Sequence, residues 1–278
     1  MTLQHRGVKP TVCVVGSTNV DLVVTGPRLP LPGETVSDGV FHRSPGGKGA
    51  NQALAAVRAG AATTFVAGIG DDGLGDEALR TLRSSGVDLS RVITVPGSAT
   101  GVALIAVDAS GENQIAVAPG ANHKVGPHDV DSRGFDAVLC QMEIRDDTLA
   151  TAADQATGLF ILNAAPARPI PEGVLERADI IIVNETERDF LSAQLEQFSG
   201  TLVVTEGAKG AAAHKGGACL ASAQPPRVDA IDTVGAGDAF CGTFAAYLAG
   251  GAELKQALER ACEAGAVAAT KAGAQSPD

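Results

Sequence analysis

The chain has 278 residues, which is enough for one large α/β domain or two smaller ones and for a substantial hydrophobic core. Its formal net charge is −11, no block of basic residues occurs, and aromatic residues make up 3% with no tryptophan. These features argue against a nucleic-acid partner and against an anionic membrane surface. Most of the apolar 45% consists of small residues, which suit close packing of helices on a sheet.

Cysteine and histidine usage excludes two further classes of protein. The five cysteines are scattered, odd in number and without C-x-x-C spacing, so neither a disulfide framework nor a zinc site is predicted. The five histidines are equally dispersed. No signal peptide and no apolar run of about 18 residues occurs. We therefore expect a soluble, cytoplasmic protein with reduced thiols and no membrane partner.

Apolar runs and helical stretches alternate along most of the chain, which predicts a doubly wound, mostly parallel α/β sheet with helices on both faces. The predicted strands, in chain order, are 11–16, 63–69, 137–142, 159–163, 180–184 and 201–205. The predicted helices are 49–60, 73–85, 146–157, 185–195, 236–249 and 253–271.

Three regions break this alternation. Residues 34–43 and 101–118 are extended and rich in turn residues, without a helical period. They fit either a small flap outside the main sheet or two ordinary surface hairpins. Residues 209–228 are predicted to form a meander at the sheet edge. With no linker or repeat in the sequence, we expect a single domain over 1–278, with extra strands inserted at about 34–44 and 100–120.

The most informative segment is 232–244, in which small residues run into an apolar helix with Asp238 in its first turn. A helix N-terminus attracts anions because its first N–H groups are unpaired and its dipole is positive there. A carboxylate beside a phosphate is explained if Asp238 takes a proton from an attacking hydroxyl. The alternative is a glycine-rich turn in which Asp238 only starts the helix. The backbone concerned belongs to Gly235, Ala236 and Gly237.

Polar residues follow the first predicted strand. Asn19 and Asp21 are separated by one residue, so in an extended segment both project to the same side. In open α/β sheets, ligands bind beyond the carboxyl ends of the strands. The pair could hold adjacent hydroxyls of a polyol, or it could form an Asx turn.

A second glycine-rich segment, 45–53, opens the next helix. It is not a Walker A loop, because Gly49 follows Lys48 where Ser or Thr is required and His42 occupies the position of the first glycine. It remains either a candidate substrate loop, in which Asn51 is a further polar side chain that could contact the substrate, or a plain helix start.

The segment 68–73 matches G-x-G-x-x-G between a strand and a helix. Asp71 and Asp72 lie inside the turn, where their charges would repel a pyrophosphate. Dinucleotide binding is therefore disfavoured.

A possible metal and nucleotide region follows the strand that ends near residue 184. Asn184 and Glu187 are three residues apart, so at a helix start they can face one site. Such a pair suits a hydrated Mg²⁺ held partly by phosphates, or it forms a capping box. Thr205 and Gly207, after the next strand, could line a nucleotide pocket through their backbone.

Taken together, the motifs resemble the PfkB family of carbohydrate kinases, from about residue 12 to residue 275, and above all its ribose-phosphorylating branch. The resemblance implies a ribokinase-like α/β fold with a small β lid at the two extended segments, usually shared across a homodimer. The segments that carry it are 16–21, 32–35, 46–52, 163–168, 184–187, 232–238 and 271–275.

The resemblance also implies an activity: transfer of the ATP γ-phosphoryl group to the hydroxymethyl oxygen of a pentose, with D-ribose giving D-ribose 5-phosphate. Asp238 would be the general base, and the backbone of 235–238 an anion hole. Alternatives are a kinase of deoxyribose, fructose or adenosine, or a catalytically silent sugar-binding relative. The implied sugar-binding residues are Asn19, Asp21, Gly46, Gly47, Lys48, Asn51, Glu143 and Asp238.

The same resemblance implies two cations. Mg²⁺ would be organised with the phosphates by Asn184 and, through water, by Glu187, while Thr205, Gly207 and Gly237 border the nucleotide. A monovalent activator, K⁺, would bind beside the anion hole, largely through backbone carbonyls. The implied K⁺ residues are Asp232, Val234, Ala268, Lys271, Gly273 and Ser276.

Overall fold

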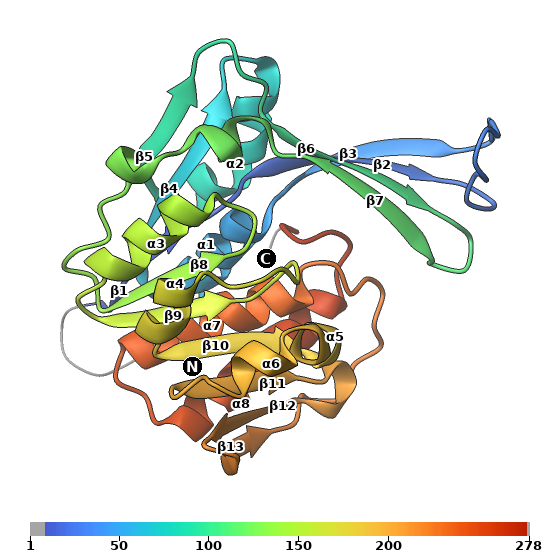
Figure 1. Cartoon of the computed structure of the whole chain (residues 1–278). Coiled ribbons are helices and arrows are strands. Elements are labelled where there is room, and N and C mark those ends of the chain that lie inside the picture. The colour runs from blue at the N-terminus through green and yellow to red at the C-terminus, as the bar shows by residue number, and fades with distance from the viewer. Residues whose placement is uncertain (1–8, 277–278) are drawn as a thin grey trace.

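The computed structural model describes residues 9–276, which form two sheets and their covering helices (Figure 1). The main sheet has nine strands in the order β13-β12-β11-β10-β9-β8-β1-β4-β5. In this order, the seven strands from β11 through β1 to β5 are all parallel to one another, and β12 and β13 add an antiparallel edge. Its strands are β1 (Thr11–Val15), β4 (Ala62–Gly70), β5 (Asp88–Val95), β8 (Ala137–Gln141), β9 (Leu159–Asn163), β10 (Ile180–Asn184), β11 (Thr201–Thr205), β12 (Ala211–Lys215) and β13 (Ala218–Ala223).

The main sheet is buried on both faces, and β1 shows how the sequence achieves this. Val12 and Val14 pack into one hydrophobic cluster, while Cys13 and Val15 pack into another. Alternate side chains of a strand point to opposite faces, so an uninterrupted apolar run serves two cores at once. The chain thus has the predicted α/β architecture.

Among the described residues, four helices contribute to the first cluster, and of a second group of four all but 185–190 contribute to the second. The first group is α1 (Lys48–Arg58), α2 (Gly73–Ser85), α7 (Ala236–Ala249) and α8 (Leu254–Ala269). The second group is α3 (Asp146–Gln155), α4 (Glu172–Arg177), α5 (Glu185–Phe190) and α6 (Ser192–Leu195). Short 3₁₀ turns complete the described chain: η1 (Gly120–Lys124), η2 (Pro127–Asp129) and η3 (Gly207–Lys209).

The second sheet has four strands in the order β3-β2-β6-β7 and projects from the main body as a long twisted ribbon (Figure 1). Strand β2 pairs antiparallel with β3 and parallel with β6, and β6 pairs antiparallel with β7. The strands are β2 (Asn19–Thr25), β3 (Val40–Gly46), β6 (Gly101–Val107) and β7 (Asn113–Ala118).

The sequence placed the first part of this sheet incorrectly. It predicted extended chain at 34–43, whereas residues 34–39 form no strand and β3 runs to Gly46. It did not predict β2 as a strand, but it gave an extended segment as one alternative for Asn19 and Asp21, and that alternative is the one observed. Asn19 and Asp21 are strand residues whose neighbours Val20 and Val23 are buried.

Several helix boundaries follow from local signals. Asp72 caps α2 and Gly86 ends it in the left-handed conformation, with φ 82°, so the predicted helix 73–85 is confirmed. The helix predicted at 185–195 is instead two short helices that meet at Leu191, a buried residue. Strand β5 and helix α4 were not predicted, whereas the edge meander is present as β12 and β13.

Within residues 9–276, no helix is both long enough and apolar enough to cross a membrane. The five cysteines, which all lie in this range, are free thiols, as their spacing predicted.

Candidate active site

Asp238 lies in the first turn of α7, with 8% of its surface exposed, and both of its carboxylate oxygens accept hydrogen bonds from α1. Asn51 Nδ2 donates to Oδ2 and Gln52 Nε2 donates to Oδ1, each at 2.9 Å. The two helices approach closely at Gly242, where an added Cβ would lie 2.2 Å from the Gln52 carbonyl oxygen. The packing of α7 on α1 therefore fixes the orientation of the Asp238 carboxylate.

A chain of amides continues behind these two donors. Gln52 Oε1 accepts from Gln141 Nε2 at 2.7 Å, and Asn51 Oδ1 accepts from Gln275 Nε2 at 3.0 Å. Gln52 Nε2 also donates to Asn163 Oδ1 at 2.9 Å. Because the amide oxygens of Asn51 and Gln52 already accept hydrogen bonds, their NH₂ groups are the ones that face Asp238.

The sequence did not identify Gln52, Gln141, Asn163 or Gln275 as site residues. The available signal was a polar residue at the end of an otherwise apolar strand. Gln141 ends β8 and Asn163 ends β9, and the two are register partners. Side chains at these carboxyl ends converge on the place where open α/β sheets bind ligands.

The N-terminus of α7 has no side-chain cap. Its N-cap, Gly235, adopts φ 79°, and a Cβ there would lie 2.5 Å from Ala274 Cβ, so the position requires glycine. Gly237 is exposed, and a Cβ built on it meets no atom of the described residues within 4 Å outside its own helix. The Ala236 N–H donates to the Thr233 carbonyl at 3.2 Å, whereas the N–H groups of Gly237 and Asp238 have no side-chain cap, which leaves this turn suited to an anion beside Asp238.

The predicted sugar-binding residues come together between β2 and the start of α1. A Cβ on Gly46 would lie 2.3 Å from Asp21 Oδ2, so the loop backbone runs directly against the Asp21 carboxylate. Asn19 Oδ1 accepts a hydrogen bond from Asn122 Nδ2 at 2.8 Å. Gly47 has φ 93°, which turns the chain from β3 into α1. The structure therefore places both halves of the predicted polyol site side by side.

Glu143 follows β8, and its carboxylate reaches the loop after β1. Oε2 accepts hydrogen bonds from the Ser17 hydroxyl and, at 3.3 Å, from the Lys48 backbone N–H. Strand β1 lies between β8 and β4 in the main sheet, and the chain continues from β1 to the β4 side. The strand order therefore reverses between β1 and β8, and the Glu143 contact lies at this topological switch point. A cavity of about 720 Å³ borders Glu143 and extends to Val117 in β7 of the second sheet. Ser17 was not predicted as a site residue.

Charges are concentrated in this region. Burial, together with the nearby carboxylates of Glu143 and Asp238, raises the pKa of Asp21 to about 6. Burial alone would lower the pKa of Lys48, but the charges of Asp238, Glu143 and Glu187 outweigh it and raise the pKa above its usual value. Lys48 is thus a persistent cation among three carboxylates.

Asn184 and Glu187 form a capping box at the start of α5. Asn184 Oδ1 accepts from the Glu187 N–H, and Glu187 Oε2 accepts from the Asn184 N–H, both at 2.8 Å. Among residues 9–276, no three His, Cys, Asp or Glu side chains gather as an all-protein metal site. Asn184 and Glu187 therefore fit a Mg²⁺ site only if water and substrate phosphates supply most of the ligands of the ion. Burial raises the pKa of Glu187.

Thr205 is the last residue of β11 and pairs with Asn184, the last residue of β10. Thr205 Oγ1 donates to the Val183 carbonyl at 3.3 Å, and Gly207 begins η3 with φ 54°. Both residues therefore lie at the carboxyl end of β11, at the same edge of the sheet as Asn184.

The residues predicted to hold K⁺ form two loops joined by Asp232. Its Oδ1 accepts from Val234 N–H and its Oδ2 from Gly273 N–H, each at 2.9 Å. The Ser276 hydroxyl donates to the Gly273 carbonyl at 3.2 Å. This pair of loops adjoins the α7 N-terminus through Gly235 and Ala274. Asp232 is the one carboxylate among the residues predicted to hold K⁺, and backbone N–H groups already donate to both of its oxygens. Ala268 and Lys271 lie in the same turn, where Lys271 N–H donates to the Ala268 carbonyl at 3.1 Å.

Known proteins resemble this chain in sequence and in fold. The model of the pfkB family of carbohydrate kinases matches residues 9–278. A ribokinase of Bacillus subtilis is 36% identical over 95% of this chain and 94% of its own. A deoxyribokinase of Salmonella typhi is 32% identical over 95% and 94%. The structure of Arabidopsis thaliana ribokinase complexed with ribose and ATP superimposes with a TM-score of 0.88 at 30% identity, over 98% and 96% of the two chains.

The chain therefore belongs to the pfkB family of carbohydrate kinases. It is a ribokinase-like sugar kinase, a phosphotransferase that acts on a sugar hydroxyl.

Proposed function

We propose that the protein transfers the γ-phosphoryl group of ATP to the C5 hydroxymethyl oxygen of D-ribose, giving D-ribose 5-phosphate and ADP. The observation that carries this proposal is the Asp238 carboxylate, held by two amides beside an uncapped helix N-terminus. A relative of similar length and fold is described as complexed with ribose and ATP. The arrangement supplies a base and an anion site within one helical turn.

The chemical step needs little covalent participation by the protein. Asp238 accepts the proton of the C5 hydroxyl, the oxygen forms a bond to the γ-phosphorus, and the bond from that phosphorus to the β–γ bridging oxygen breaks to release ADP. Negative charge on the transferred group meets the backbone N–H groups of 235–238. Asn51 and Gln52 keep the carboxylate pointed at the hydroxyl and prevent it from turning to cap its own helix.

The sugar hydroxyls are assigned to the residues between the two sheets. Asp21 and Glu143 accept hydrogen bonds, while Asn19 and Asn51 supply amides. The backbone of Gly46 and Gly47 closes the site, and Lys48 offsets the negative charge of its neighbours. Because β2 and β3 carry part of this set, the second sheet acts in the proposal as the lid over the sugar.

Two cations complete the proposal. Mg²⁺ would be held by substrate phosphates and by water bound to Glu187, near Asn184, and would neutralise phosphate charge. The nucleotide would lie along Thr205, Gly207 and Gly237. K⁺ would occupy the loops joined by Asp232 and make the neighbouring anion site rigid.

We further propose that two copies pair through the second sheet. Both of its faces expose apolar side chains: Phe41, 60% exposed, and Leu104, 56% exposed, lie on one, and Ile115, 57% exposed, lies on the other. Exposed apolar area of this extent on a thin sheet indicates a protein contact. Light scattering is expected to give a dimer, and Phe41→Lys is expected to shift it toward the monomer.

The substrate is tested by measuring ADP release with ribose, deoxyribose, fructose and adenosine, each with and without K⁺. Ribose is expected to give the highest kcat/KM, and K⁺ to increase it. A higher kcat/KM for deoxyribose would replace the proposed activity with that of a deoxyribokinase, the name of the Salmonella typhi relative. Turnover of none of these compounds would overturn the proposal in favour of a silent sugar-binding role.

A further inference from the structure

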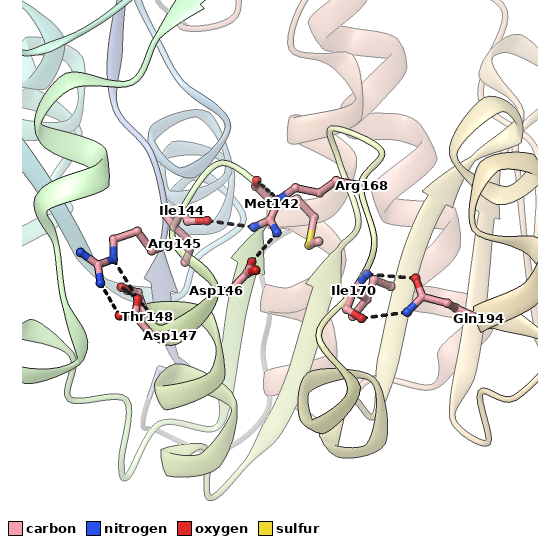
Figure 2. A network of polar contacts seen from close by, with 9 residues as sticks. All are labelled: Met142, Ile144, Arg145, Asp146, Asp147, Thr148, Arg168, Ile170 and Gln194. Atoms are coloured by element: carbon pink, nitrogen blue, oxygen red, sulfur yellow. Dashed lines mark hydrogen bonds and ion pairs between the residues drawn. The ribbon is translucent and has the colours of Figure 1, made fainter.

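Arg168, in the loop after β9, holds the loop that carries Glu143 (Figure 2). Its Nε donates to the Met142 carbonyl at 2.8 Å, and its Nη2 donates to the Ile144 carbonyl at 2.9 Å. Its Nη1 pairs with Asp146 Oδ1, at the start of α3. One planar guanidinium thus binds three points of the segment between β8 and α3.

The two carbonyls belong to the residues on either side of Glu143. Fixing both fixes the peptide planes around Glu143, and with them the direction in which its side chain leaves the backbone. Met142 N–H also donates to the Ala165 carbonyl at 2.9 Å, which ties the same loop to the segment preceding Arg168. The rigid fork of a guanidinium is suited to this task, whereas a lysine could reach only one acceptor well.

The carboxylate end of Glu143 is held from the opposite side. Ser17 and the Lys48 backbone N–H both donate to Oε2. Arg168 therefore fixes where the Glu143 side chain begins, and the start of α1 fixes where one of its oxygens lies. The remaining oxygen, Oε1, has its position determined by these two anchors, and Glu143 and Arg168 both border the 720 Å³ cavity.

We propose that Arg168 is a positioning residue for sugar binding, which acts through Glu143 without touching the sugar. This inference rests on the proposed function, because it takes Glu143 as a sugar ligand. Its distinctive consequence is that removing Arg168 raises the KM for the sugar and has a smaller effect on kcat, because the base and the anion site lie on α7.

The chain contains a matched control for this test, Arg177. It makes a clamp of the same composition: Nη2 donates to the carbonyls of Ala156 and Gly158 at 2.7 and 3.2 Å, and Nη1 pairs with Asp179 at 2.9 Å. Its side chain is 30% exposed, against 29% for Arg168. Arg177 clamps the chain just before β9, at the end of the sheet opposite to the site, whereas Arg168 follows that strand. The two alanine variants therefore lose equivalent contacts at opposite ends of one strand.

The experiment measures KM and kcat for ribose in wild type, Arg168→Ala and Arg177→Ala, with the free energy of unfolding of each. We expect similar losses of stability, a rise in KM of about 10- to 100-fold for Arg168→Ala only, and a KM within about twofold of wild type for Arg177→Ala. Arg168→Lys, which keeps the charge, provides a folded variant if the alanine variant does not fold, and its KM should lie between the two. Equal KM values for the two alanine variants, or a fully restored KM in Arg168→Lys, would overturn the inference.

A double-mutant cycle tests whether Arg168 acts through Glu143. In a Glu143→Ala background, Arg168→Ala should change KM by less than about threefold, because the residue it positions is gone. A multiplicative effect of the two substitutions would contradict action through Glu143. If Glu143→Ala alone leaves KM unchanged, or if wild type does not phosphorylate ribose, the proposed function fails instead, so the two failures can be told apart.

Discussion

Two glycine-rich junctions between a strand and a helix, each containing aspartate, behave in opposite ways in this molecule. At the start of α2, Asp72 Oδ1 accepts from the N–H groups of Leu74 and Gly75, both at 3.2 Å. At the start of α7, Gly235 provides no side-chain cap, and Asp238 is turned sideways to the amides of α1. At the first junction the aspartate occupies the N–H groups of the helix start, whereas at the second the N–H groups of Gly237 and Asp238 have no side-chain cap.

The difference comes from the position of the aspartate within the helix start. Asp72 is the N-cap, from which a carboxylate reaches the N–H groups two and three residues later. Asp238 is the third residue after its N-cap, already inside the first turn, where its side chain projects from the helix surface. Glycine content alone does not define an anion site. What defines it is whether a side chain already occupies the N–H groups.

Replacing the aspartate of each junction with asparagine should give the largest difference in kcat between the two junctions. Asp238→Asn is expected to lower kcat by about 10²- to 10⁴-fold, because an amide cannot accept the hydroxyl proton. Asp72→Asn should leave kcat unchanged, because asparagine is also a good N-cap. Steady-state kinetics with ribose measure both. A kcat for Asp238→Asn within a few-fold of wild type would remove Asp238 from the mechanism.

Adding a carboxylate to each junction should give the next largest difference, which we expect in the kcat/KM for ATP. Gly237→Asp places a negative charge at the open N-terminus of α7, and the kcat/KM for ATP should fall by about tenfold or more because the charge competes with phosphate. Gly73→Asp, at the capped start of α2, should change it little. A Cβ meets no atom of the described residues within 4 Å at either glycine outside its own helix, so both variants should fold. Equal effects of the two substitutions on kcat/KM would show that the N-terminus of α7 does not bind phosphate.

The pH dependence should distinguish the carboxylate beside the site from ordinary surface acids. Asp21 has a pKa of about 6, so its protonation as the pH falls through 6 should raise the KM for ribose several-fold. Asp21→Asn should have a KM that is raised but no longer changes over this range. Kinetics from about pH 5 to 8 measure the profile, and an unchanged profile in the variant would assign the titration elsewhere.

The same pKa has a consequence for stability. A folded-state pKa above the ordinary 3.8 means that the ionised form is disfavoured by folding, so this contribution is present below about pH 4 and lost as the pH rises through 6. Asp21→Asn should therefore increase the free energy of unfolding near pH 7, by at most about 3 kcal/mol, with the difference disappearing toward pH 4. Chemical denaturation at the two pH values measures it. A variant less stable than wild type at pH 7 would contradict the expectation.

The smallest effect is expected from removing the cap of α2. Asp72→Ala removes the cap and also the two hydrogen bonds that Asp72 accepts from Thr100, so it should lower the free energy of unfolding by about 1 to 3 kcal/mol while leaving kcat and KM unchanged. Denaturation and kinetics on the same preparation measure both quantities. A loss of activity without loss of stability would indicate that the G-x-G-x-x-G junction has a catalytic role after all.

The sequence predicted much of the main sheet because its signals are local. Apolar strands, the Asp72 cap and the Gly86 stop each act within a few residues. The second sheet was harder, because β2 is defined by pairing with β3 and β6, which lie about 20 and 80 residues later in the chain. Its polar start, Asn19 to Asp21, was compatible with an extended segment or an Asx turn, and no local signal decided between the two.

The candidate site shows the same division. Asp238, Asn51 and the glycines of the two loops stand in recognisable motifs. Asn163 and Gln275 lie in segments that carry the family resemblance, but no local signal marked them as site residues, and Gln141 stands in no motif. The contacts of all three exist only when distant parts of the chain meet. Arg168 is a further case, because its acceptors are backbone carbonyls, which no sequence pattern marks.

The central claim is that Asp238 directs phosphoryl transfer from ATP to the C5 oxygen of ribose. Phosphorus NMR of the product formed by wild-type protein from ATP, Mg²⁺, K⁺ and ribose carrying ¹³C at C5 tests it most directly. The account predicts a single sugar phosphate whose phosphorus couples to the labelled C5, and its absence with Asp238→Asn under the same conditions. A phosphate on another ribose oxygen, or the same product at the same rate from the variant, would contradict it.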